Sequence, residues 1–324
     1  MDITQFKKTY EHKKVEENKN KVAVNPLVSV CIQTYQHVHY IKECLDGILN
    51  QKTNFDFEIL LGEDASTDGT REICIDYAER YPEKIRLFLH HRENNISVGG
   101  KPSGRFNFLY NLYTAQGKYI ALCEGDDYWT DPLKLQKQVD MLEKNHNLGL
   151  CFTDCKLVDT KNKVLKENFI PPKFQRELNQ SDILSRFCPN TNTTLFRREL
   201  IVGINFENFK SVYNGDSFLF GFILQKLNAG YLPIKGGAYR EHEGGIWSQK
   251  KQEFKLEKSI DTCLIIMKSY RVNEPQLFES YVDKRFRKLF ALRKHIKAKQ
   301  ALSLLWKYMV FKWTFFTVRN SIFS

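Results

Sequence analysis

From Pro26 onward, short apolar segments alternate with segments whose apolar residues recur at helical spacing. The apolar segments are residues 28–32, 57–61, 85–89 and 118–123. Between the first two, Ile41, Leu45 and Ile48 repeat with the period of an amphipathic helix. Strands that are apolar throughout and separated by helices are typical of a mostly parallel sheet that is covered on both faces. The chain is therefore predicted to have an α/β fold.

Polar residues gather where three of these predicted strands end. The clusters are Gln33-Thr34-Tyr35, Gly62-Glu63-Asp64 and Glu124-Gly125-Asp126-Asp127. Ligands of parallel sheets bind at the carboxyl ends of the strands. The third cluster holds three acids within four positions, and crowded carboxylates repel one another unless a cation or a donor-rich ligand lies among them. Such oxygen ligands suit a hard divalent ion. The alternative is a solvated acidic turn.

The second half of the chain predicts shorter, less regular elements. They are a strand at 150–153, a hairpin around the turn 159–162, a strand at 191–196, a helix at 214–227 and two short strands at 231–234 and 238–242. Further on, residues 286–296 have apolar residues at helical spacing, which predicts a C-terminal helical extension.

The cysteines and the N-terminus bear on the compartment. Eight cysteines are scattered through the chain without a Cys-x-x-Cys pair, which argues against a zinc site or a thioredoxin-like motif. Buried free thiols fit a reducing compartment. Residues 7–21 are rich in Lys and Glu and lack the apolar core of a signal peptide. These features predict a cytoplasmic protein.

The net charge lies entirely in the tail. Eleven Lys and Arg residues and no acid follow Asp283, so residues 284–324 carry the whole net charge of +11. Residues 302–316 are mostly apolar and aromatic but are too short and too charged for a spanning helix. Cations beside Trp and Phe predict a helix on an anionic membrane surface, held by a salt-sensitive contact. The alternative is a helical pair packed on the core with solvated lysines. A nucleic-acid role is disfavoured, because no recognised binding motif accompanies the charge.

Three segments, in this order and at this spacing, resemble the motifs of glycosyltransferase family 2. Residues 28–35 look like its opening strand, and residues 62–70 (Gly-Glu-Asp-Ala-Ser-Thr-Asp-Gly-Thr) resemble its V-D-D-G-S-T-D-G-T segment. Residues 124–129, followed by Asp131-Pro132-Leu133-Lys134-Leu135, are similar to the Asp-x-Asp region of a bacterial branch. The resemblance extends over about residues 26–245. It implies a GT-A (Rossmann-like) fold that binds a nucleoside diphosphate sugar with a divalent metal, Mn²⁺ or Mg²⁺.

Carried over by position, the resemblance implies that Gln33, Tyr35 and Asp64 hold the base and ribose of the donor. Tyr35 can stack on a nucleobase, and Asp64 can accept an N–H from uracil. The alternatives are a strand-end aromatic covering the core for Tyr35 and a turn cap for Asp64. Gln33 stands where the family often has Pro, Thr or Ser, and Glu63 replaces the first Asp of its motif.

The resemblance also implies a metal and diphosphate site. Asp126 would contact the ribose or the metal, and Asp127 would bind the metal, which neutralises charge on the leaving group. His242 would complete the metal shell or touch a phosphate, unless it is only a surface histidine. Arg240 would stabilise the phosphates. Arg105 sits where the family places a basic residue near the donor, although a salt bridge to Glu124 or another acid explains it equally well.

Transfer with inversion needs one base, and the resemblance places it at Asp216. This carboxylate would remove the proton of the acceptor hydroxyl as that oxygen attacks. The alternative is a plain helix N-cap, for which Asp is favoured.

These features together predict an inverting, metal-dependent glycosyltransferase at the inner face of the cell membrane. It would move a sugar from a UDP-sugar to a hydroxyl of a lipid-linked or growing glycan in surface polysaccharide assembly. The predicted parts are a lead segment (1–25), a GT-A domain (26–245) and a basic, aromatic helical extension (246–324). A non-catalytic sugar-nucleotide-binding protein tethered by its tail to membrane or nucleic acid is the alternative. A nucleotidyltransferase is disfavoured, because residues 33–37 differ from that class's Gly-rich, basic loop.

Overall fold

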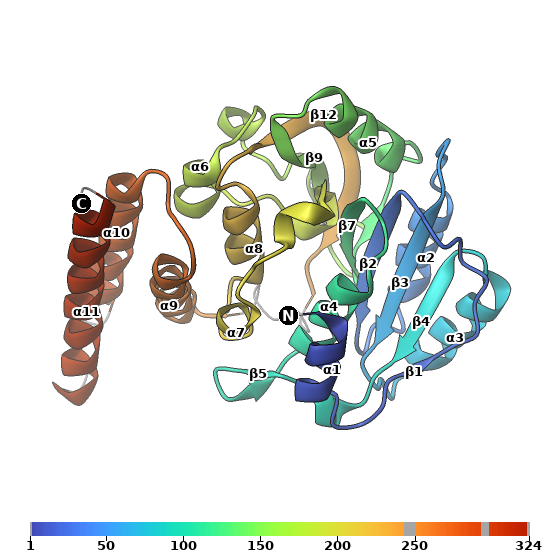
Figure 1. Cartoon of the computed structure of the whole chain (residues 1–324), viewed down its shortest axis with the longest axis horizontal. Coiled ribbons are helices and arrows are strands. Elements are labelled where there is room, and N and C mark those ends of the chain that lie inside the picture. The colour runs from blue at the N-terminus through green and yellow to red at the C-terminus, as the bar shows by residue number, and fades with distance from the viewer. Residues whose placement is uncertain (1, 243–249, 293–297, 323–324) are drawn as a thin grey trace.

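The computed structural model describes residues 2–242, 250–292 and 298–322, and in the last segment it describes the side chains of 302–313, 315 and 316. Within these residues, ten strands form one sheet in the order β1-β4-β3-β2-β7-β11-β9-β12-β8, with β10 paired to β9 (Figure 1). The strands are β1 (Glu16–Glu17), β2 (Val28–Thr34), β3 (Phe57–Glu63), β4 (Ile85–Leu89), β7 (Tyr119–Glu124), β8 (Tyr128–Trp129), β9 (Leu148–Val158), β10 (Val164–Lys166), β11 (Thr194–Arg197) and β12 (Asn228–Arg240). A separate small hairpin joins β5 (Ser97–Val98) to β6 (Lys101–Pro102).

Helices cover both faces of the sheet, as predicted for a GT-A-like α/β fold. They are α1 (Ile3–Tyr10), α2 (Ile41–Leu49), α3 (Thr70–Arg80), α4 (Arg105–Thr114), α5 (Lys134–Lys144), α6 (Gln180–Ser185), α7 (Phe206–Phe209), α8 (Gly215–Ile223), α9 (Gln252–Ser269), α10 (Pro275–Leu292) and α11 (Ala298–Ile322). One apolar cluster packs α2, α3 and α5 on one face, and the other packs α1, α4, α6 and α8 on the opposite face. Neighbouring residues of β2 alternate between the two clusters: Val30 and Ile32 face one, and Cys31 faces the other.

The predicted parallel strands are all present. Strand β2 lies between β3 and β7 and is parallel to both, and β3 is parallel to β4. Beyond β7 the sheet becomes mixed, because β11 runs antiparallel to both β7 and β9, whereas β12 is parallel to β9. The carboxyl ends of β2, β3 and β7 therefore meet at one edge.

Three predictions in the second half were wrong in detail. The helix expected at 214–227 ends at Ile223. The strands expected at 231–234 and 238–242 form the single strand β12, whose pairing with β9 shifts register between Leu232 and Gly237. The strand expected from Thr191 begins at Thr194, because residues 191–193 form a 3₁₀ turn. The side chain of Asn190 stabilises this turn by accepting a hydrogen bond from the backbone of Asn192.

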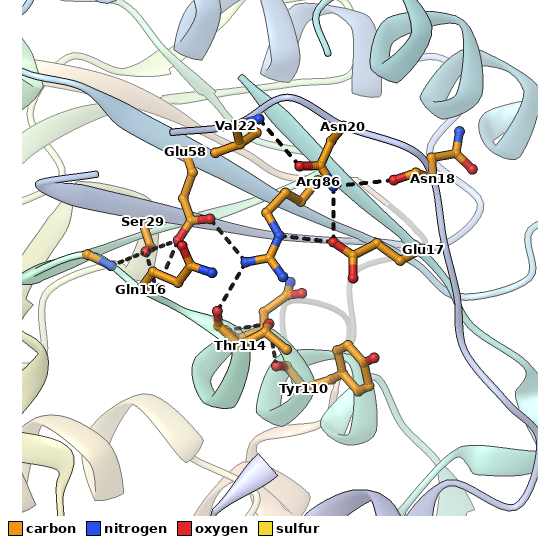
Figure 2. A network of polar contacts seen from close by, with 12 residues as sticks. Glu17, Asn18, Asn20, Val22, Ser29, Glu58, Arg86, Tyr110, Thr114 and Gln116 are labelled. Atoms are coloured by element: carbon orange, nitrogen blue, oxygen red, sulfur yellow. Dashed lines mark hydrogen bonds and ion pairs between the residues drawn. The ribbon is translucent and has the colours of Figure 1, made fainter. Parts of the chain in front are cut away.

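The N-terminal segment packs onto the edge of the sheet. Helix α1 buries Phe6, and β1 pairs antiparallel with β4. Figure 2 shows the polar network behind this edge. Arg86 on β4 donates to Glu17 at 3.0 Å and to the buried Glu58 at 3.2 Å, and Ser29 donates to Glu58 at 2.6 Å. The lead segment thus protects a sheet edge that would otherwise be open.

The predicted C-terminal helical extension is present and packs on the rest of the protein. Phe286 and Leu289 of α10 and Phe311 and Phe315 of α11 belong to the same apolar cluster as α4 and α8. Figure 1 shows α10 and α11 side by side at one end of the molecule, with β4 toward the other end. None of the helices in the described residues is long and apolar enough to cross a membrane. The tail cations Arg293, Lys294 and Lys297 lie outside the described residues, as do the side chains of Lys299 and Arg319.

Candidate active site

The loops after β2 and β3 are held together by backbone and side-chain hydrogen bonds. The backbone N–H of Asp64 donates to the carbonyl of Thr34 at 3.1 Å, and that of His37 donates to the Thr70 hydroxyl at 2.8 Å. Gln33 lies between Gly62 of β3 and Glu124 of β7 in the sheet register. The polar clusters predicted from the sequence therefore lie at one edge of the sheet.

Tyr35, Asp64 and Arg92 form one corner of this edge. The Tyr35 side chain is exposed, and the guanidinium of Arg92 lies 4.0 Å from its ring centre. Arg92 also donates to the Oδ2 atom of Asp64 at 2.5 Å, and Asn95 donates to the same oxygen at 3.3 Å. An exposed aromatic ring next to an ionic pair can accept a flat, polar ring by stacking.

Asp64 keeps one unused acceptor in this corner. It is buried, and its Oδ1 atom has no hydrogen-bond partner among the described residues. Burial raises the pKa of Asp64 to about 6, although the charge of Arg92 opposes the shift. A buried carboxylate oxygen without a donor is costly, so this atom fits a ligand N–H.

Glu63, which departs from the family's motif, shapes the loop that carries Asp64. Its side chain is fully buried and accepts from the backbone of Ser66 at 2.6 Å and from Arg71 at 2.6 Å. The residue therefore holds its own loop in place, and in this structure its carboxylate is engaged within the protein.

Three acids crowd the end of β7. Both oxygens of Glu124 accept from the Thr191 hydroxyl at 2.7 Å, and burial raises the pKa of Glu124 to about 7. Asp127 is almost fully buried, and burial followed by the charges of Asp126 and Glu124 raises its pKa well above the ordinary value. Such crowding disfavours three negative charges unless a cation joins them.

Asp126 is the best compensated of these acids. His242 lies with its Nε2 atom 2.9 Å from the Asp126 Oδ2 atom, and His37 lies 3.9 Å from the same oxygen. Burial alone would raise the pKa of Asp126, but the hydrogen bond with His242 and the charges of both histidines lower it. The structure thus places His242 at the acidic cluster, and it adds His37.

Arg240 lies beside the same acids but faces other partners with its side chain. Its backbone N–H donates to Asp127 Oδ1 at 2.8 Å, and its Nε donates to the Asp126 carbonyl at 2.9 Å. The guanidinium also donates to Glu43 at 2.6 Å and to Asn162 at 2.6 Å. In this structure Arg240 supports the loop that carries the acids, and its contact with a phosphate stays a prediction.

Asp216 lies in the first turn of α8, and the helix N-cap is Asn214. The Oδ1 atom of Asp216 accepts from the backbone of Ser217 at 2.8 Å. Burial raises the pKa of Asp216, while the charge of Arg105 opposes the shift. The charge of Asp216 contributes to the raised pKa of Glu124, so the two carboxylates lie within electrostatic reach of each other.

Arg105 lies against the segment that leads into α8, where the charge of Asp216 acts on it. Its guanidinium donates to the carbonyl of Val212 at 2.9 Å and lies 4.6 Å from the ring centre of Phe209. A Cβ atom added at Gly215 would lie 2.3 Å from the Arg105 Nη1 atom, so glycine there allows the close approach. Burial lowers the pKa of Arg105 to about 10, and Asp216 opposes this shift.

The donor set of the acidic cluster suits a divalent cation. In the part of the chain that the structure describes, no group of three or more His, Cys, Asp or Glu side chains is arranged to hold a metal ion. Mg²⁺ is usually bound by one or two carboxylates together with substrate phosphates, so a complete protein cage is not required. Asp126, Asp127 and His242 thus fit such an ion in chemistry.

Several residues of this edge were missed in the sequence. Arg92 and Asn95 follow β4, whose carboxyl end lies at the same edge as those of β2, β3 and β7. The position of these two residues after a predicted strand is the signal that could have identified them. His37 lies three residues after the end of β2, in the loop at the same carboxyl end. Thr191 contacts Glu124, and the thiol of Cys188 affects the pKa of Asp216. Both residues come from the irregular second half of the chain, where no predicted parallel strand marks the site.

Comparison with known proteins agrees with this fold. A family model described as glycosyl transferase family 2 matches residues 29–203. An uncharacterised protein of Mycobacterium tuberculosis (strain H37Rv) is 36% identical over 220 residues, which are 68% of this chain and 60% of that protein. The chain thus spans less than two thirds of the length of this relative.

Two solved structures share the fold. S. aureus TarS 1–349 in complex with UDP-GlcNAc superposes with a TM-score of 0.62 at 17% identity, covering 89% of this chain and 81% of that chain. The mannosyltransferase PcManGT from Pyrobaculum calidifontis, in complex with GDP-Man and Mn²⁺, superposes with a TM-score of 0.56 at 17% identity, covering 96% and 89%. At this identity the likeness shows the fold alone. Because the family model matches more than half of the chain, we conclude that the chain belongs to glycosyltransferase family 2.

Proposed function

We propose that this protein is an inverting, metal-dependent glycosyltransferase that uses a UDP-sugar. Its acceptor is a hydroxyl of a lipid-linked or growing glycan in surface polysaccharide assembly. The observation that carries this proposal is the gathering of Asp64, Asp126, Asp127 and Asp216 around one edge of the sheet. Each of these acids is at least partly buried, and together they offer places for a base, a diphosphate with its metal and an acceptor hydroxyl.

The base of the donor lies at the corner made by Tyr35, Asp64 and Arg92. The Tyr35 ring stacks on the base, and the free Oδ1 atom of Asp64 accepts an N–H from it. Uracil carries such an N–H at its ring edge, so a uridine nucleotide suits this corner. Arg92, which now covers the Tyr35 ring, moves aside or packs on the base edge.

The diphosphate lies near the acidic cluster. Asp126, Asp127 and His242 would hold the divalent ion, Mn²⁺ or Mg²⁺. When bound, such an ion neutralises the charge that develops on the leaving diphosphate. PcManGT, a protein of the same fold, was crystallised with Mn²⁺ and a nucleotide sugar, which supports this assignment.

Asp216 acts as the base. As the acceptor oxygen attacks the anomeric carbon, its proton passes to the Asp216 carboxylate, and the bond between that carbon and the phosphate oxygen breaks. The nucleoside diphosphate leaves from the opposite face, so the configuration inverts. Its raised pKa makes Asp216 a stronger proton acceptor than an ordinary aspartate. Arg105 holds the segment before α8 in place through the Val212 carbonyl.

The proposed location is the inner face of the cell membrane. Eleven cations follow Asp283 without any acid, which suits an anionic lipid surface. All eight cysteines are free thiols, in keeping with a reducing compartment. A lipid-linked acceptor would be found at such a surface.

Calorimetry with nucleotides is the experiment that tests the proposal. UDP, GDP, CDP and ADP are titrated into the full chain with Mn²⁺ and with EDTA. We expect UDP alone to bind, only with the metal, and Asp127→Asn to bind at least about tenfold more weakly because a metal ligand loses its charge. Asp76→Asn, at an exposed ion pair on α3, is the control and should bind like the wild type.

The Asp216→Asn variant separates binding from chemistry. It should bind UDP normally but slow the hydrolysis of a bound UDP-sugar, in which water replaces the acceptor, by about 100-fold or more. Failure of the folded wild type to bind any of the four nucleotides would instead favour a non-catalytic protein tethered by its tail.

A further inference from the structure

Helix α11 carries a stripe of large apolar side chains on its outer face. Trp306 and Trp313 are 63% and 70% exposed, and four further apolar residues of this helix are exposed as well. The α11 stripe consists of Leu302, Leu305, Trp306, Met309, Trp313 and Phe316. At about 100° of rotation per residue, these six positions fall within an arc of about 100° on one side of the helix.

The opposite side of α11 is already covered. Leu304, Phe311 and Phe315 are buried and belong to the apolar cluster that α9 and α10 share. The helix is thus apolar on two opposite faces, only one of which packs on the protein. A helix that is apolar all round is normally buried on all sides, whereas the α11 stripe is exposed among the residues that the structure describes.

Two cations of α11 have side chains that the structure describes, and both are turned toward the protein. Lys307 donates to Asp261 at 2.9 Å, and Lys312 donates to Asp283 at 3.0 Å. Both lysines flank the buried face, and their charges are balanced by carboxylates of α9 and α10. They are therefore engaged within the protein and do not carry a surface contact of α11.

The neighbouring helix supplies the charge that selects a partner. Lys284, Arg287 and Lys288 of α10 are exposed, and α10 packs against α11 (Figure 1). No Asp or Glu follows Asp283. A second copy of this chain on the α11 stripe would bring two strongly cationic segments together, which is repulsive. An anionic bilayer offers both an apolar interior and negative headgroups.

We propose that α11 lies flat on a bilayer with anionic headgroups and buries the α11 stripe at the boundary between headgroups and acyl chains. The inference rests on the proposed membrane location and identifies the surface that makes the contact. Because the protein covers the inner face of α11, only the stripe can face lipid, so the helix lies along the membrane plane. Trp306 and Trp313 suit this boundary, where an indole finds both apolar and polar surroundings.

This mode of contact changes the expected salt dependence. The sequence predicted a contact through cations, which salt would screen. Burial of the α11 stripe is not screened by salt, so it holds the protein at the bilayer once it is in place. The α10 cations then set the preference for anionic lipids.

The test is binding of the full chain to vesicles of phosphatidylcholine, with and without phosphatidylglycerol, measured by flotation and by tryptophan fluorescence. The double variant Trp306→Ser/Trp313→Ser should bind anionic vesicles at least about tenfold more weakly. Val202→Ser is the matched control, because Val202 is 79% exposed and lies outside the stripe. It should bind like the wild type. Binding of the wild type should largely persist at about 0.5 M salt, where charge contacts are screened.

Three results would overturn this inference. The first is equal vesicle binding by the wild type and the double tryptophan variant, and the second is complete release by salt. The third is a wild type that does not bind vesicles; if it forms a dimer that the tryptophan substitutions disrupt, the stripe belongs to a second copy. UDP binding is measured on the same proteins. If it is retained, the glycosyltransferase proposal stands whatever the vesicles show, and if the wild type lacks it, that proposal fails separately.

Discussion

At the donor corner, two opposing effects set the pKa of Asp64. Burial favours the protonated carboxyl, whereas the charge of Arg92 favours the carboxylate. The resulting pKa of about 6 lies close to neutral pH. A protonated carboxyl loses part of its capacity to accept a hydrogen bond from a base N–H. We therefore expect the affinity for UDP to fall by about tenfold as pH decreases through about 6, as expected for the loss of one charge-assisted bond.

Calorimetry at fixed Mn²⁺ between pH 5 and 8 measures this dependence. Asp64→Asn should bind UDP weakly across the range and lose the inflection. Titration of the UDP phosphate is common to both proteins and cancels in their ratio. The same pH profile in both proteins would mean that Asp64 does not contact the base.

At this scale the sequence located the acids but not their partners. Asp64, Asp126 and Asp127 could be predicted, because each follows directly after an apolar strand. Arg92 follows a strand as well, yet its position over Tyr35 depends on how the loop after β4 folds back. The side-chain direction of Arg240 depends on Glu43, which is distant in the chain, and no local pattern reports such a contact.

At the scale of elements, a polar network joins β1, β4, β3 and β2 on the side of the sheet that ends in β1. Glu58 of β3 is fully buried and is paired with Arg86 of β4 (Figure 2). Arg86→Ala would leave Glu58 without its cation, so we expect a loss of about 3–5 kcal/mol in the free energy of unfolding. Arg80→Ala removes an exposed pair with Asp76 and should cost about 1 kcal/mol or less. Urea denaturation compares the two.

A third protein tests the cause of this loss. Replacing both partners, as Arg86→Met with Glu58→Leu, should recover part of the stability, because no buried charge is then left unpaired. Equal, small effects of Arg86→Ala and Arg80→Ala would show that the network contributes little to the edge.

The strands of the parallel half were predictable, because a strand buried on both faces is a continuous apolar run. Residues 57–61 and 85–89 are apolar except for Glu58 and Arg86, and they form β3 and β4. Strand β12 was divided in two, because Pro233 and the pair Gly236-Gly237 normally interrupt a strand. Its pairing with β9 absorbs them through register shifts. A Cβ atom at Gly236 would lie 2.3 Å from the Thr153 hydroxyl oxygen, a contact that only the folded sheet reveals.

For the whole molecule, the charge distribution pointed to the tail, but the tail's packing could not be read from it. Residues 284–324 carry all of the net charge, which predicted a segment that contacts a partner. The same residues also contribute Phe286, Leu289 and Phe311 to the apolar cluster. Apolar spacing on two faces of one helix leaves open which face packs inward, and only the positions of α9 and α10 decide it.

This packing predicts what removal of the last helix would do. A chain ending at Leu292 would lack the buried side chains of Leu304, Phe311 and Phe315. Full burial of one large apolar side chain contributes about 1.5–3 kcal/mol to the free energy of unfolding. It would also remove Lys312 from Asp283 and Lys307 from Asp261, which would keep only Lys258. We expect thermal unfolding at a clearly lower temperature, whereas Trp306→Ser/Trp313→Ser, which changes only exposed positions, should unfold like the wild type. UDP binding at a temperature where the shortened chain is folded should be retained, because the residues assigned to the donor all precede α9.

An unchanged unfolding temperature of the shortened chain would mean that α11 contributes nothing to stability, and truncation would then be a clean test of membrane binding. The packing predicts the opposite, so loss of binding on truncation would report unfolding together with the lost stripe, and only the substitutions on the outer face separate the two.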